Sequence, residues 1–171
     1  MGPEKKATPM NSEIETVRYG FVAGAAGGFA EIAWVTLYAG VSGGDAAILA
    51  RGVTSAAGVN ALLPSSPVVL GIIVHMTLAV IVGLLLAFTW REMREQWPSL
   101  RSAYPFSLAA LTGIWALNFL IVLPIVSPPF VHLVPYTVSL TSKLLFGIAA
   151  ALALQLQTVF ELDGRRKISP K

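Results

Sequence analysis

The chain has 171 residues, of which 55% are hydrophobic and only 12% are charged, and its mean hydropathy is +0.71. A soluble globular domain carries about 25% charged residues, so this composition leaves too little polar surface for a water-soluble protein. It argues against a soluble enzyme, a disordered segment or a nucleic-acid-binding domain. The formal net charge of +3 reflects where the lysines and arginines lie rather than an acidic partner, and the absence of cysteine excludes disulfides and thiolate chemistry.

Four apolar segments are each long enough to cross a bilayer, which takes about 20 residues of helix. The predicted spans are residues 17–39, 67–90, 105–126 and 135–157. We therefore expect an all-α integral membrane protein, a four-transmembrane-helix bundle forming a single domain over residues 1–171, with cytoplasmic tails at 1–12 and 160–171. Ser12 and Glu15 have the form of a capping box, which predicts that the first helix begins near Glu13.

The positions of lysine and arginine predict the orientation of the bundle. Ten of the twelve lie in the N-terminal segment up to Arg18, between the second and third spans, or in the C-terminal tail. Of the other two, Arg51 lies in the first outer loop and Lys143 lies inside the fourth span. Both termini are therefore predicted to be cytoplasmic.

The first outer loop, residues 40–66, is predicted to contain a short helix. Asp45 is a suitable N-cap and the helix is expected to end near Gly58. This helix would lie on the outer membrane surface or fold back onto the bundle. Ser66 and Pro67 then have the pattern of an N-cap and first residue for the second span.

Ionisable residues inside membrane spans are costly and point to function or to pairing. The chain has three, Glu31, His75 and Lys143, and Asn118 is a polar fourth. A rise of about 1.5 Å per residue puts all four roughly 12–13 Å from the outer ends of their spans, one on each helix. The first and fourth helices of an up-down bundle are neighbours, so we expect Glu31 and Lys143 to pair and the other two to complete a hydrogen-bonded layer. Whether this layer only fixes helix register or handles protons or ions stays open.

Small residues recur at helical spacing and predict faces where helices approach closely. They serve packing inside the bundle or self-association, and the pattern does not separate the two. The predicted helix-packing glycines are Gly20, Gly24, Gly28, Gly71, Gly83 and Gly147. Pro124 is expected to kink the third span and to widen a polar vestibule above Asn118.

No cofactor or metal site is predicted, and the chain has neither a phosphate-binding loop nor a recognised catalytic motif. The remaining alternative is haem b held between His75 and His132. His132 lies in the third outer loop, three residues before Pro135, so that pairing would require the loop to dip inward.

Residues 70–152 carry features that resemble a known group of proteins. These features are Gly71-x-x-x-His75, Gly83, Trp115 with Pro124, and the run Leu144-Leu145-Phe146-Gly147. They resemble uncharacterised bacterial inner-membrane proteins, including the YagU-like domains of unknown function. The resemblance implies a bacterial inner-membrane location. In that group a second histidine often precedes the run in the fourth span, and Lys143 occupies that position here.

Three functions follow from these features. The first expectation is a non-enzymatic accessory or structural subunit of a larger membrane complex, because the loops are short and catalytic motifs are missing. The alternative is a small proton- or ion-coupled carrier or channel that uses Glu31, His75 and Lys143. The third is a haem- or quinone-binding membrane anchor. The expected partners are membrane lipids and other integral-membrane subunits or a second copy of the chain.

Overall fold

The computed structural model describes residues 9–168, and within them the side chains of residues 13–156. Every regular element in this part of the chain is helical. In order, these are α1 (Pro9–Val41), α2 (Ala46–Ala56), α3 (Pro67–Gln96), α4 (Tyr104–Leu117), the π-helical turn η1 (Asn118–Val122), α5 (Leu123–Val126), α6 (Pro128–Val131) and α7 (Tyr136–Ile168).

Four helical stretches are long and apolar enough to cross a membrane, as the sequence predicts. They are Glu13–Val41, Pro67–Gln96, Tyr104–Val126 and Tyr136–Leu156. Large apolar side chains such as Phe21, Phe29 and Leu85 point outward from these helices and are more than half exposed. Such a surface suits lipid rather than water, and the chain is a multi-pass membrane protein.

The helices are longer than the predicted spans, and these boundaries need correction. α1 begins at Pro9 rather than near Glu13, and the capping box predicted at Ser12 lies outside the described side chains. α3 continues to Gln96, and α7 continues to Ile168 through most of the segment predicted as a tail. The apolar length of a span marks what fits in hydrocarbon, whereas a helix continues into water where the sequence favours it.

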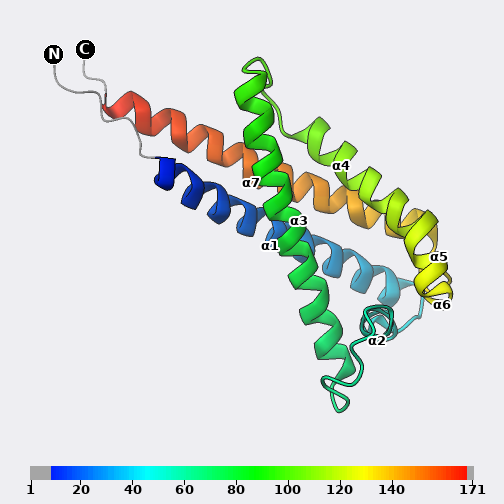
Figure 1. Ribbon diagram of the computed structural model, residues 1–171. Helices are drawn as coiled ribbons and strands as arrows, with labels where there is room; N and C mark the ends of the chain where they lie inside the picture. The colour runs from blue at the N-terminus through cyan, green and yellow to red at the C-terminus, as the bar shows by residue number, and fades with distance from the viewer. Residues whose placement is uncertain (1–8, 169–171) are drawn as a thin grey trace.

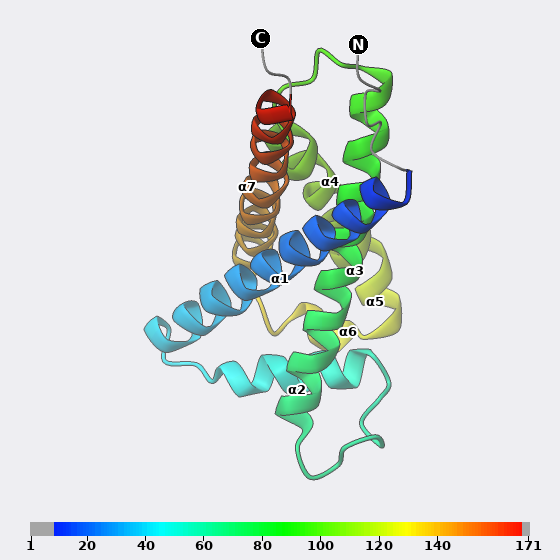
Figure 2. The same ribbon diagram turned by 90° about the vertical axis from the view of Figure 1, so that its left-hand side faces the viewer.

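The four spans do not form a symmetric bundle. α1 packs against both α3 and α7, and α4 packs mainly against α7, whereas α3 and α4 have little contact. Figure 1 shows α3 crossing α1 while α4 runs along α7. Figure 2 shows the start of α1, the end of α7 and the α3–α4 connection toward one end, and α2 and α6 toward the other. This is the arrangement that an even number of spans requires.

The crossing of α1 and α3 depends on glycine. A Cβ atom on Gly24 would lie 2.5 Å from the carbonyl oxygen of Ala79, and one on Gly83 would collide with the backbone of Gly20 and Gly24. Gly28 meets the Ala79 side chain on the same face. The small-residue faces predicted in the first two spans therefore pack against each other within one chain.

The other two predicted packing glycines also face neighbouring helices. Gly71 in α3 packs against Ala50 of α2, and Gly147 in α7 packs against Leu108 of α4, whose Cδ2 atom would lie 3.3 Å from an added Cβ. All six glycines predicted to pack helices therefore do so in the structure.

α2 packs against the first turns of α3. Asp45 is its N-cap residue, and its Oδ1 accepts a hydrogen bond of 2.8 Å from the backbone N–H of Ala47. Thr54 is fully buried, and its hydroxyl lies 2.7 Å from the carbonyl oxygen of Pro67. Ser66 precedes α3 as predicted, but its side chain makes no capping hydrogen bond.

The third span is an irregular helix. α4 passes at Asn118 into η1, and the following α5 contains Pro124. Proline has no N–H to donate, and its ring clashes with the carbonyl one turn earlier. A π-helical turn is one of the ways in which a helix accommodates such a break. The irregularity predicted at Pro124 is thus present, as a wide turn that begins at Asn118.

The well-packed core fills the half of the molecule near the α3–α4 connection. It contains Leu86, Trp90, Leu111, Phe146 and Leu154, all at most 4% exposed. The other half of the molecule, toward α2 and α6, contains a cavity.

Candidate functional site

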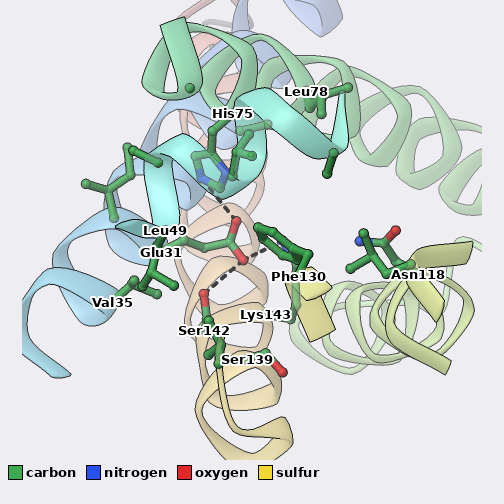
Figure 3. Close-up of a pocket in the computed structure, with 18 of the residues that line it drawn as sticks. Glu31, Val35, Leu49, His75, Leu78, Asn118, Phe130, Ser139, Ser142 and Lys143 are labelled. Carbon is green, nitrogen blue, oxygen red and sulfur yellow. Dashed lines mark hydrogen bonds and ion pairs between the residues drawn. The ribbon is translucent and has the colours of Figure 1, made fainter. Parts of the chain in front are cut away.

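Glu31 is the centre of a polar cluster between α1, α3 and α7. Its side chain is 3% exposed, and its Oε1 lies 2.6 Å from Nζ of Lys143. The same oxygen accepts a hydrogen bond of 3.1 Å from the hydroxyl of Ser142. Figure 3 shows Glu31 between His75 on one side and Lys143 and Ser142 on the other. The structure therefore contains the Glu31–Lys143 contact expected from their depths.

His75 completes the cluster from α3, but its contact with Glu31 is not a well-formed hydrogen bond. Its Nε2 lies 3.5 Å from Oε2 of Glu31. Both atoms are buried, and neither has a hydrogen-bond partner among the described residues. Buried polar atoms without partners are uncommon in proteins, so this contact is the chemically least satisfied point of the cluster.

Small residues of α1 bring Glu31 close to both neighbouring helices. A Cβ on Gly27 would lie 2.5 Å from the ring of Phe146 in α7, and Gly28 faces Ala79 in α3. One turn after Glu31, the indole N–H of Trp34 donates a hydrogen bond of 3.1 Å to the carbonyl oxygen of Val138 in α7. These contacts place the carboxylate where α3 and α7 can both reach it.

A cavity of about 620 Å³ lies beside this cluster and has walls from all the described helices. Most of its lining side chains are apolar, and Glu31, His75 and Lys143 provide its charged side. Leu78 of α3 is 55% exposed and Val122 of η1 is 39% exposed, yet both line the cavity. They therefore mark its rim, between the two spans that barely touch. In a bilayer this opening would face lipid.

Asn118 does not join the cluster, and that expectation was wrong. Its side chain lines the cavity but makes no hydrogen bond to the described residues, and Figure 3 shows it well apart from Glu31. The predicted depth of Asn118 in the membrane does not explain this; its position around the bundle does. Asn118 lies on the span that packs against α7, across the cavity from α3.

Ser142 is the site residue that the sequence did not reveal. It is 6% exposed, and its hydroxyl on α7 donates a hydrogen bond to the carboxylate of Glu31 on α1. The only signal was a serine directly before an intramembrane lysine. Ser139, one turn earlier, also lines the cavity, and its hydroxyl accepts a hydrogen bond of 3.0 Å from the indole N–H of Trp115.

The two histidines are not brought together. His75 lines the cavity, whereas His132 is exposed in the segment after α6 and is not among the lining residues. The geometry therefore gives no support to a haem held by this pair. Within the part of the chain described, no three histidine, aspartate or glutamate side chains converge to hold a metal ion.

Comparison with known proteins found no matching family model, curated protein or solved structure. The resemblance of residues 70–152 to YagU-like proteins stays a prediction. Function must therefore be inferred from the chemistry of the cluster and the cavity.

Proposed function

We propose that this protein is a small proton-coupled carrier whose substrate binds in the cavity between the helices. The observation that carries the proposal is the contact of Glu31 with His75. Oε2 and Nε2 face each other at 3.5 Å and lack hydrogen-bond partners within the described chain. One proton held between them would give both atoms a partner. A carboxylate and an imidazole at this distance form a group that can take up and release a proton.

A purely structural ion pair explains less of this arrangement. Glu31 and Lys143 alone would neutralise each other and fix the register of α1 against α7. That role needs neither a third titratable group nor a cavity beside the pair. Here His75 and about 620 Å³ of space adjoin the same carboxylate, which favours a site that changes its protonation state when something binds.

Infrared spectroscopy of the protein in lipid tests for the proton site. Across a pH titration we expect one buried carboxyl to gain and lose a proton together with an imidazole signal. Glu31→Gln should remove both changes, whereas the exposed Glu95→Gln should leave them intact. If the fold persists across the titration and no coupled carboxyl–imidazole change occurs, the carrier proposal fails.

A transport assay then tests carriage itself. Vesicles with an alkaline interior and a pool of hydrophobic acids, bases and neutral compounds are assayed by mass spectrometry for compounds that accumulate. If the protein is a carrier, at least one compound should accumulate in vesicles that contain the wild-type protein. This accumulation should be lost when a protonophore is added, and it should be absent from vesicles that contain the Glu31→Gln variant.

The accessory-subunit function is a second candidate because α3 and α4 barely contact and leave the cavity open between them. A helix of a partner protein could cover this opening. Gentle solubilisation, a native gel and mass spectrometry of each slice separate the two functions. Co-migration with a larger set of proteins supports a subunit, and migration alone or as a small homo-oligomer supports the carrier.

We further infer a location in the inner membrane of a bacterium, with both termini cytoplasmic. The support is the lysine and arginine distribution and the resemblance of residues 70–152. Because the chain has no cysteine, single cysteines report the orientation directly. Ser65→Cys should react with a membrane-impermeant maleimide on cells whose outer membrane has been removed. Ser99→Cys should react only after lysis, and the reverse pattern would invert the topology.

A further inference from the structure

We propose that the cavity binds an amphipathic organic monoanion, a carboxylate on an apolar chain, together with one proton. This inference rests on the proposed carrier function and names its substrate class. It follows from three features of the site: the unused hydrogen-bonding capacity of Lys143, the charge balance of the cluster, and the shape of the cavity.

The ammonium group of Lys143 has N–H bonds that no described residue accepts. An ammonium group has three N–H bonds, and in the described part of the chain the only hydrogen-bonding or ion-pairing partner of Nζ is Glu31. The Lys143 side chain is 21% exposed and lines the cavity, with Nζ 5.9 Å from the centre of the Phe146 ring. An oxygen acceptor in the cavity can therefore reach the ammonium group, and a carboxylate is the acceptor that a buried cation binds most strongly.

The charges around the cavity balance before anything binds. Glu31 and Lys143 neutralise each other, and His75 is the only other titratable side chain among the lining residues. α2 contributes Asp45 and Arg51, but these pair with each other at 3.2 Å, are exposed and do not line the cavity. The helices α4, η1, α5 and α6 contain no Asp, Glu, Lys or Arg.

This balance explains why an anion would bring a proton. A bound carboxylate alone would leave one net negative charge in a poorly solvated site, which is costly. If a proton from water enters between Glu31 Oε2 and His75 Nε2, the site is neutral again, and Lys143 pairs with the bound carboxylate. The bond to hydrogen in the hydronium ion or buffer acid that supplies the proton breaks, one O–H or N–H bond forms on Glu31 or His75, and nothing is oxidised or reduced. An organic cation would instead be repelled by Lys143.

The shape of the cavity fits one charged head and an apolar chain. A volume of about 620 Å³ lies within the usual range for small-molecule sites. The charged groups form one cluster, and most of the other lining side chains are apolar, among them Leu49, Leu78 and Val82. Since the rim lies between α3 and η1, a molecule already dissolved in the bilayer can enter sideways.

Calorimetry with decanoate tests the inference on the full chain in lipid nanodiscs, with empty nanodiscs as the blank. Titrations in two buffers of different ionisation enthalpy give the number of protons taken up. We expect saturable binding of decanoate with one proton per molecule, and no saturable binding of decylammonium or decanol. Lys143→Gln should weaken decanoate binding by at least about ten-fold, a loss typical of a charged hydrogen bond.

Glu31→Gln gives the most specific outcome. In this variant Lys143 no longer pairs with a carboxylate on α1, so a bound decanoate alone neutralises its charge. The variant should therefore bind decanoate without taking up a proton. Val82→Phe leaves the ion pair intact and should weaken binding by filling the cavity. Arg91 does not line the cavity, so Arg91→Gln should bind as wild type.

The inference is overturned if decanol or decylammonium binds saturably and as tightly as decanoate. It is also overturned if the wild-type protein does not bind decanoate, or if Val82→Phe leaves decanoate binding unchanged. If infrared titration still shows the shared proton in that case, only the substrate class is wrong. If the shared proton is absent, the carrier proposal fails as well.

Discussion

Neutralising Glu31 measures how much the cluster contributes to stability. Glu31→Gln keeps the size of the side chain and an acceptor oxygen but leaves the charge of Lys143 unpaired beside a position that is 3% exposed. Removing one partner of a buried ion pair costs about 3–5 kcal/mol, so we expect the free energy of unfolding to fall by that amount. Lys143→Met should cost slightly less, because His75 can partly compensate the charge left on Glu31.

The double variant Glu31→Gln/Lys143→Met separates pairing from other effects. It leaves no unpaired charge, so its cost should be smaller than the sum of the two single costs by about 1–3 kcal/mol. Unfolding in mixed micelles of rising dodecyl sulfate content, followed by tryptophan fluorescence, gives all three values. The matched control is Glu95→Gln, which breaks an ion pair of 3.1 Å with Arg91 at a side chain that is 60% exposed.

An exposed pair of this kind contributes about 0.3–0.5 kcal/mol, about one-tenth of the value expected for Glu31. If Glu31→Gln costs no more than this control, the carboxylate is not buried with its partner as described. If the two single costs simply add, Glu31 and Lys143 do not stabilise each other and the electrostatic basis of the site is wrong.

Three further results are expected from the same unfolding assay. The deficit of Lys143→Met should shrink as pH falls, because protonation neutralises the carboxylate that has lost its partner; a deficit independent of pH would argue against a titratable cluster. Gly83→Leu should cost about 3 kcal/mol, since the added side chain meets backbone. Gly113→Leu, with nothing within 4 Å of its added Cβ, should not destabilise the protein. Gln155→Leu should cost about 1–2 kcal/mol, because it removes hydrogen bonds of 3.0 and 2.8 Å to the segment that starts α4; an unchanged stability would mean that solvent replaces them.

The depth of each polar residue could be predicted from the sequence, because the rise of an α-helix per residue is fixed. Counting from the ends of the spans put Glu31 and Lys143 at one level, and the structure brings them to 2.6 Å. The same count put Asn118 at that level too. Its lateral position depends on which helices are neighbours, and an up-down bundle assigns α4 a contact with α3 that scarcely exists.

Ser142 shows a second limit of the sequence. Hydroxyl side chains in helices commonly donate to the carbonyl one turn earlier, as Thr77, Thr112 and Thr141 do here. Nothing local distinguishes a serine that donates to its own helix from one that donates to a carboxylate on another. Only the approach of α1 to α7 gives Ser142 its partner.

The glycines that pack α1 against α3 also account for the cavity. Because Gly24 and Gly83 meet backbone to backbone, α3 is held tightly to α1 where the two helices cross. α4 follows α7 instead, so α3 and α4 are free to separate beyond the crossing, and the cavity opens between them at Leu78 and Val122. Close packing at one point and an open, lipid-facing cavity at another are thus two results of one crossing. A substitution that loosens the crossing should therefore disturb ligand binding even though it touches no residue of the charged cluster.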